Sequence, residues 1–301
     1  MILKIAKTPN DNYRSSLHLQ RQDSPFPKSI ALLAGNGHYP QLCAQRMKAL
    51  GIDIHLLALD EMIDENFFTS FPFQSRTQIH IGHIGKILKT LKKTQVSHAI
   101  TAGQIQPQKL FNGLHPDLKA FWLLRKLRQK NAATIFGAIS EEIEAMGIQV
   151  LDARSFMDED LAEEGSMTRS AWKLPSHVLE QGIHITREIA KLDIGQGIVL
   201  HNGTVLCVEG FDGTDAMLQY AGRFHVHPKL FVKTSKLNQD FRFDVPVFGI
   251  KTLEYMYQNG VEYAVLEAGK TLILDKKNVL AQADDWHIHI YGYAQLKDIP
   301  S

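Results

Sequence analysis

The sequence has few cysteines, no long apolar segment and no excess of either charge. Cys43 and Cys207 are the only cysteines in 301 residues, which is too few for a disulfide framework and indicates a reducing compartment, the cytoplasm. No segment reaches the roughly 18 apolar residues of a membrane-spanning helix, and the first residues lack the apolar core of a signal peptide. The 33 basic and 32 acidic residues give a formal net charge of +1, so composition gives no reason to expect nucleic acid as a partner.

What the sequence does contain is typical of a soluble globular protein. Apolar residues make up 44% of the chain and charged residues 22%, and the length suffices for one large or two ordinary domains. Both cysteines are expected to be buried small apolar residues. Residues 1–27 are predicted to be a poorly structured extension, and Pro25 and Pro27 stand at its end.

Apolar runs alternate with helical patterns from Ser29 onward. The run "SIALLA" is followed by the turn "GNGHYP", the helix-like "QLCAQRMKALG" and the strand-like "IDIHLLALD", and this alternation continues to "IQVLDA". The pattern predicts an α/β fold with a Rossmann-like, parallel-sheet N-terminal domain over residues 28–157. The acidic stretch 158–166 is the predicted linker, and residues 167–301 are predicted to form a separate C-terminal α+β domain, with a hairpin at "HNG".

The turn "GNGHYP" places Gly35 and Gly37 between a strand and a helix, where backbone amides and the helix dipole can receive a phosphate. Asp60 ends the next strand, near the position of a ribose-binding carboxylate in dinucleotide-binding folds. Pro40 stands where the third glycine of that fingerprint belongs. The pattern leaves two interpretations open, a nucleotide site or a tight turn.

The stretch "QDFRFDVP" alternates polar and apolar side chains. Asp240, Arg242 and Asp244 are separated by Phe241 and Phe243, which predicts a strand with one polar and one buried face. Such a face suits a protected edge strand as well as a site. In a straight strand the Cα atoms of Asp240 and Asp244 would lie roughly 13 Å apart, so the two carboxylates would reach one metal only if the strand bends.

The stretch "VEGFDGTDAML" gathers Glu209, Asp212 and Asp215 around a glycine-containing turn that opens a helix. Thr214 or Asp215 would serve as a helix cap. The same carboxylates would also suit a hard divalent cation beside a helix start that receives phosphate. Both interpretations stay open on local grounds.

Several motifs together resemble one known family. The stretches "IALLAGNGHYP", "HIGHIGKILKTLKK", "AGQIQP", "PDLKAF", "KLDIGQGIVL", "VEGFDGTDAML", "FVKTSKLNQDFRFDVPVFGIKTL" and "EAGKTLILD" resemble, in order, the metal-dependent UDP-2,3-diacylglucosamine pyrophosphatases that are unrelated to the calcineurin-like ones. The resemblance covers about residues 28–293. It implies a cytoplasmic, homodimeric lipid A enzyme in peripheral contact with the inner membrane, which hydrolyses its substrate to 2,3-diacylglucosamine 1-phosphate and UMP.

The resemblance also implies roles for individual residues. Asp244 falls on the family's essential aspartate. Mg²⁺ or Mn²⁺ is expected as the cofactor, because a divalent cation and nearby basic groups neutralise a pyrophosphate while a nucleophile is oriented. The expected metal ligands are Glu209, Asp215, Asp240 and Asp244. The expected substrate-binding residues, placed by the family on both sides of an interdomain cleft, are Gly35, Gly37, Gly103, Asp193, Gln196, Thr214, Lys233, Lys236, Gln239 and Arg242.

Three departures from the family pattern bear on this expectation. The chain has Asn131-Ala132-Ala133 in place of Gly-Asp-Asp, Lys236-Leu237 in place of Lys-Pro, and Gln104 and Gln106 in the region where family members commonly have a basic residue. An NAD-linked oxidoreductase, supported by the glycine turn and Asp60, is one alternative. The other is a protein that binds nucleotide-sugars or lipids without turnover.

Overall fold

The computed structural model describes residues 27–59, 63–104, 117–127, 132–169 and 172–294. The predicted extension, apart from Pro27, lies outside these residues, as do Asp60, Gln106 and Asn131. The chain divides into two compact units. Unit 1 comprises the chain up to Asp158 together with Asp240–Asp244, and unit 2 comprises Glu159–Gln239 with the chain from Val245 onward.

Unit 1 contains a five-stranded parallel sheet in the order β3-β2-β1-β4-β5. Its strands are β1 (Ser29–Ala34), β2 (Asp53–Ala58), β3 (Arg76–Gln78), β4 (His98–Ala102) and β5 (Gln149–Val150). The strand order reverses between β1 and β4, the arrangement of a doubly wound fold. The predicted Rossmann-like parallel sheet is therefore confirmed.

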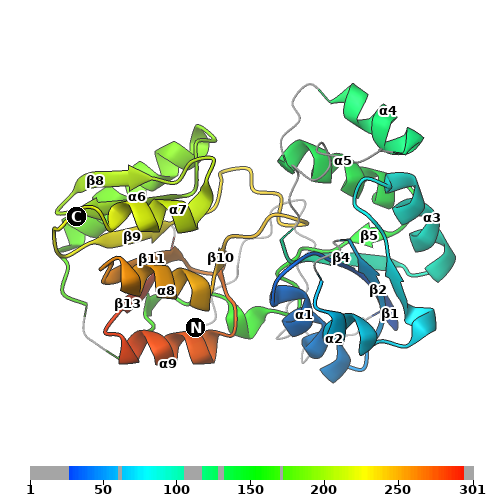
Figure 1. Cartoon of the computed structure of the whole chain (residues 1–301), viewed down its shortest axis with the longest axis horizontal. Coiled ribbons are helices and arrows are strands. Elements are labelled where there is room, and N and C mark those ends of the chain that lie inside the picture. The colour runs from blue at the N-terminus through cyan, green and yellow to red at the C-terminus, as the bar shows by residue number, and fades with distance from the viewer. Residues whose placement is uncertain (1–26, 60–62, 105–116, 128–131, 170–171, 295–301) are drawn as a thin grey trace. The chain divides into compact units, whose positions relative to one another are not determined.

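Helices cover both faces of this sheet (Figure 1). Ala31 and Leu33 of β1 pack in a core shared with α3 (Ile84–Thr94), α4 (Leu118–Lys126) and α5 (Ala132–Glu144). Alternate residues of β1 face the opposite side, where α1 (Tyr39–Ala49) contributes the buried Cys43 and Met47. The short helices α2 (Glu65–Thr69) and η2 (Phe73–Ser75) connect β2 to β3.

Unit 2 is built on a six-stranded mixed sheet in the order β6-β13-β11-β9-β7-β8. Strands β9 (Leu230–Lys233), β11 (Tyr263–Glu267) and β13 (His289–Tyr293) are parallel to one another, whereas β6 (Gly165–Ser166), β7 (Gly197–His201) and β8 (Thr204–Val208) join antiparallel. The predicted hairpin is confirmed: Asn202 and Gly203 connect β7 to β8 with φ of 47° and 83°, as a tight hairpin turn requires.

Helices also cover both faces of the unit 2 sheet (Figure 1). Helix α6 (Ser176–Lys191) packs on one face, while α7 (Gly213–Ala221), α8 (Ile250–Gln258) and α9 (Lys276–Asp285) pack on the other. Strands β10 (Val247–Phe248) and β12 (Leu272–Ile273) form a second, two-stranded sheet. The separate C-terminal domain is confirmed. Its predicted linker region contains the 3-10 helix η4 (Asp158–Asp160) and strand β6.

The strand predicted around Asp240–Asp244 is wrong. Residues 241–243 form a turn in which the amides of Phe243 and Asp244 both donate to the carbonyl of Asp240, at 3.3 and 3.1 Å. The alternating phenylalanines reflect packing of this turn on the rest of unit 1 rather than pairing in a sheet. The ring centroids of Phe243 and Phe136 lie 6.0 Å apart. Periodicity alone does not separate these two causes.

Among the described residues, no helix is both long and apolar enough to cross a membrane.

Candidate functional site

The carboxyl ends of β1 and β4 in unit 1 are joined by backbone hydrogen bonds between two loops. The amide of Gly35 donates to Ala102 at 2.8 Å, and Asn36 and Gln104 exchange two bonds of 2.9 Å. These loops lie where the strand order reverses, the position at which open α/β sheets bind ligands. Gly35 and Gly103, both predicted site residues, are thereby brought to one edge of the sheet.

Gly103 allows these two loops to approach each other closely. Its φ is +93°, and a Cβ there would lie 2.7 Å from the carbonyl oxygen of Asn36 and 2.8 Å from Cγ of Pro40. Gly37 has a similar φ of +96°, but a Cβ there would meet nothing within 4 Å. In a dinucleotide-binding fingerprint the third glycine allows the helix to pack closely on the strand. Here Gly103, after β4, instead allows a close approach to Pro40 at the start of α1.

The turn Asp240–Asp244 is anchored on unit 1 at the ends of two neighbouring strands. Thr101, near the end of β4, donates its hydroxyl to the carbonyl of Arg242, and the amide of Ala153, just beyond β5, donates to the carbonyl of Phe241 at 2.6 Å. Since Gly35 and Gly103 follow β1 and β4, the turn that carries Asp244 is held at the same edge of the sheet as the glycine loops.

A buried ion pair that was not predicted from the sequence supports this turn. Arg154 donates to both carboxylate oxygens of Asp152, at 2.9 and 2.6 Å, and both side chains are buried. The guanidinium of Arg154 lies 3.7 Å from the ring centroid of Phe241, within the range of a cation–π contact. In the sequence, the feature that could have indicated this ion pair is the motif Asp152-Ala153-Arg154 just after β5.

Arg242 links the turn to α5 by charge. Its guanidinium donates to Asp240 at 2.7 Å and to Glu144 at 2.8 Å. The hydrogen bond to Asp240 raises the pKa of Arg242, and burial opposes that change only in part. Arg242 is therefore a fixed positive charge between two carboxylates, one of which is a predicted metal ligand.

In unit 2, four predicted site residues form one hydrogen-bonded cluster. Thr214 donates its hydroxyl to Glu209 at 2.6 Å and accepts from Lys233 Nζ at 3.0 Å. The amide of Gln196 donates to Glu209 at 3.2 Å, and Lys233 Nζ lies 3.8 Å from the same carboxylate. This cluster places a buried lysine at the start of α7, where the helix dipole favours anions.

Three more predicted residues gather after β9. Lys236 forms an ion pair with Asp193, and its backbone amide donates to the side chain of Gln239 at 2.8 Å. The loop Lys236–Gln239 is thus closed on itself, and its lysine is held by a residue at the end of α6.

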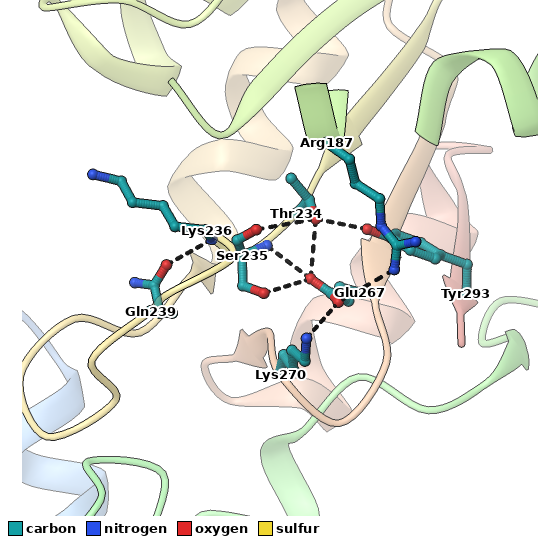
Figure 2. Close-up of polar contacts among 8 residues, drawn as sticks. All are labelled: Arg187, Thr234, Ser235, Lys236, Gln239, Glu267, Lys270 and Tyr293. Atoms are coloured by element: carbon teal, nitrogen blue, oxygen red, sulfur yellow. Dashed lines mark hydrogen bonds and ion pairs between the residues drawn. The ribbon is translucent and has the colours of Figure 1, made fainter. Parts of the chain in front are cut away.

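Glu267, which the sequence analysis did not single out, organises the carboxyl ends of β9 and β11 (Figure 2). One of its oxygens accepts from the hydroxyl of Thr234 at 3.0 Å and from the amide and hydroxyl of Ser235 at 2.8 and 2.6 Å. The other oxygen faces Lys270 at 2.8 Å and Arg187 at 3.7 Å. Glu267 is buried, with 3% of its surface exposed. In the sequence, the feature that could have indicated a role for it is its position at the start of the stretch "EAGKT".

The ionisation of Glu267 follows from these contacts. Burial by itself would raise the pKa of Glu267, but the charge of Lys270 and the hydrogen bonds from Lys270 and Ser235 outweigh burial, so the pKa lies below its ordinary value. Tyr293, at the end of β13, donates to Thr234 at 2.8 Å, and burial followed by the charge of Glu267 raises its pKa. The carboxylate is charged, and it fixes the backbone directly before Lys236.

The predicted metal ligands are not gathered in a single unit. Glu209 and Asp215 belong to unit 2, whereas Asp240 and Asp244 belong to unit 1. Asp215 pairs with Lys251 on α8 at 2.7 Å, and Glu209 contacts Thr214 and Lys233. Across the described ranges, no group of three or more His, Cys, Asp or Glu side chains is arranged to hold a metal ion. The four-carboxylate ligand set stays a prediction.

A surface hollow of about 320 Å³ lies elsewhere in unit 1, between α1 and α2. It is lined by Gln41, Ala44, Gln45, Lys48, Asp64, Asn66, Phe67 and Ser70. It contains none of the predicted site residues and does not reach the glycine loops, so we do not assign the site to it.

These features define a two-domain α/β protein with a glycine-lined sheet edge in unit 1 and a charged sheet edge in unit 2. Residues 29–160 match the family model of the LpxI N-terminal domain, and residues 163–291 match that of the LpxI C-terminal domain. UDP-2,3-diacylglucosamine pyrophosphatase LpxI of Caulobacter vibrioides is 29% identical over 278 residues, which cover 88% of this chain and 97% of that protein. The chain belongs to the LpxI family.

Proposed function

We propose that this protein hydrolyses the pyrophosphate bond of UDP-2,3-diacylglucosamine, giving 2,3-diacylglucosamine 1-phosphate and UMP for lipid A biosynthesis. The observation that carries this proposal is the match of both LpxI domains, in order, together with a pyrophosphatase relative that aligns over almost its whole length. In this reaction the oxygen of water forms a bond to one of the two phosphorus atoms, and the bond from that phosphorus to the bridging oxygen breaks. The bridging oxygen leaves as part of the other phosphate, and the protons of water pass to the solvent or to the phosphate products.

The turn at Asp240–Asp244 supports a role in this chemistry. Because Asp244 N donates to the carbonyl of Asp240 at 3.1 Å, the backbone between the two residues folds back in a turn. The separation expected for a straight strand therefore does not apply. We assign Asp244 as the residue that binds the metal or orients the attacking water.

A divalent cation fits the donors that are present. Mg²⁺ is commonly bound by one or two carboxylates together with substrate phosphates, and Asp240 and Asp244 provide such a pair, with Glu209 and Asp215 as the remaining proposed ligands. When bound, Mg²⁺ or Mn²⁺ would neutralise charge on the pyrophosphate oxygens. Lys233, Lys236 and Arg242 are proposed to bind the same oxygens.

The remaining proposed substrate contacts follow from the two sheet edges. Gly35, Gly37 and Gly103 offer backbone that a phosphate or nucleotide can approach closely. Thr214 accepts from Lys233, the amide of Gln196 donates to Glu209 beside that lysine, and Gln239 accepts from the backbone amide of Lys236. These three residues, with Asp193 beside Lys236, are proposed to contact the substrate. We also propose that the protein acts in the cytoplasm as a homodimer.

The test is hydrolysis of UDP-2,3-diacylglucosamine in the presence of Mg²⁺, Mn²⁺ or EDTA, with both products resolved by mass. We expect metal-dependent turnover that falls by about a hundredfold or more in Asp244→Asn and Asp244→Ala, as for loss of a residue that acts in proton transfer or positioning. Asp53→Asn, at the exposed start of β2, is the matched control and should leave turnover unchanged. A folded wild-type protein that binds the substrate without turnover would instead support the non-catalytic binder.

A further inference from the structure

Helix α4 of unit 1 is apolar on two opposite sides. Ala120 and Leu123 are buried in the core of unit 1, at 0% and 7% exposure. Leu118, Phe121 and Trp122 are exposed at 80%, 51% and 56%. An amphipathic surface helix normally directs polar residues outward, so the outer face of α4 has the composition of a face that is covered by something else.

The exposed residues form a continuous stripe. Leu118, Phe121, Trp122 and Arg125 stand at positions i, i+3, i+4 and i+7, which lie on one side of a helix. The rings of Phe121 and Trp122 meet edge to face, with centroids 6.2 Å apart. The guanidinium of Arg125 lies 5.7 Å from the centroid of Trp122, so the stripe ends in a positive charge.

The charge around α4 is strongly one-sided. Residues 118–127 contain three basic residues and no acidic one, whereas the whole chain carries a formal net charge of +1. The basic residues are Lys119, Arg125 and Lys126. Lys119 forms an ion pair with Glu142 on α5, at 2.7 Å, so the outward-facing positive charge of the described helix lies at Arg125 and Lys126. A partner of opposite charge with an apolar interior therefore complements this face.

We propose that the outer face of α4 docks on an anionic lipid bilayer, with Leu118, Phe121 and Trp122 in the headgroup–acyl boundary and Arg125 and Lys126 at the lipid phosphates. Helices with Trp, Phe and Leu on one face and Lys or Arg beside it bind in this plane, and each basic residue near an anionic surface adds to the attraction. The choice of a membrane as partner rests in part on the proposed function, because a substrate with two acyl chains resides in a bilayer.

The first experiment measures binding to vesicles of phosphatidylethanolamine with and without phosphatidylglycerol, by co-sedimentation and by quenching of tryptophan fluorescence with brominated lipid. Wild type is expected to bind the anionic vesicles and to be released by high salt. Phe121→Ser/Trp122→Ser is expected to weaken binding by about tenfold or more. Arg125→Glu/Lys126→Glu is expected to weaken it by at least about fivefold per charge.

Phe73→Ser is the matched control, because Phe73 is an isolated aromatic residue of unit 1 that is 80% exposed. This variant should bind vesicles as wild type does. Circular dichroism and thermal unfolding establish that each variant is folded. If wild type does not bind anionic vesicles, or if both α4 variants bind them as tightly as wild type, the proposal is wrong. A smaller particle mass for the α4 variants, without loss of vesicle binding, would identify the stripe as a subunit contact instead.

Hydrolysis assays separate this proposal from the proposed function. On substrate dispersed in nonionic detergent, the α4 variants should turn over at the wild-type rate, whereas on substrate embedded in vesicles they should be slower. Vesicle binding that depends on α4, with no turnover by wild type in detergent, would uphold the docking surface and reject the pyrophosphatase. Turnover in detergent with no vesicle binding would reject the docking surface alone.

Discussion

The loops after β1 and β4 in unit 1 meet through their backbones, whereas the ends of β9 and β11 in unit 2 are held together by charged side chains. In unit 1, Gly35 and Gly103 bring two loops into direct contact. In unit 2, Lys233 and Glu267 are buried and held by hydrogen bonds. The difference implies that the first edge is sensitive to added atoms and the second to altered charge.

The largest effect is expected where an atom is added to the unit 1 edge. Gly103→Ala would place Cβ 2.7 Å from the carbonyl oxygen of Asn36 at a φ of +93°. Backbone strain and overpacking together should lower the free energy of unfolding by about 3 kcal/mol or more. Chemical denaturation followed by circular dichroism measures this change.

Gly37→Ala separates the effect of backbone strain from that of overpacking. Gly37 has nearly the same φ, +96°, but open space around the added Cβ, so only the strain should remain, at about 1 to 2 kcal/mol. If the two variants lose equal stability, the contact between the β1 and β4 loops is not what requires a glycine at position 103.

A smaller effect is expected where charge is removed from the unit 2 edge without change of shape. Glu267→Gln keeps an acceptor for Ser235 but removes the charge that faces Lys270 and Arg187. We expect a loss of about 2 kcal/mol near neutral pH, the range for hydrogen bonds to a charged group. Turnover should also fall, with a higher KM, because Ser235 directly precedes Lys236.

The pH dependence of Glu267→Gln gives a second readout. The pKa of Glu267 in the folded protein lies below the ordinary value of 4.5, so its charge stabilises the fold fully above pH 4.5 and this contribution is lost as the pH falls through the lower folded pKa. The stability difference between wild type and variant should therefore shrink as the pH decreases below about 4.5. A difference that is constant with pH would contradict the role of the charge. Glu267→Asp should restore the pH dependence in part.

Much of the architecture could be predicted from the sequence because local patterns match it. The buried runs before Gly35 and around "HAITA" have the continuous apolar character of parallel strands, and Asn202-Gly203 has the chemistry of a hairpin turn. The turn at Asp240–Asp244 could not be predicted in this way. Its phenylalanines alternate because they pack on Phe136 and Arg154, which are far away in sequence.

Motifs in the sequence suggested some candidate site residues, whereas other residues are recognised only from their tertiary contacts. Lys233 and Thr214 stood in recognisable stretches, and the structure brings them together with Glu209. Glu267 and Arg154 act by holding neighbouring backbone or a ring. Such support depends on which strands lie side by side, which no local pattern expresses.

The smallest effect on stability is expected at Asp215 and Lys251. The side chain of Lys251 is 70% exposed and that of Asp215 38%, and the hydrogen bond to Asp215 raises the pKa of Lys251. A double-mutant cycle with Asp215→Asn and Lys251→Met should give a coupling below about 0.5 kcal/mol in unfolding free energy, as for other exposed ion pairs.

Turnover measurements on the same variants test whether Asp215 also binds the metal. If Asp215→Asn lowers Mg²⁺-dependent turnover strongly while Lys251→Met does not, Asp215 belongs to the metal site, and its pairing with Lys251 is replaced when the cation binds. If neither substitution changes turnover, the first turn of α7 contributes to the charged edge through Thr214 alone, and Asp215 must be removed from the proposed ligands.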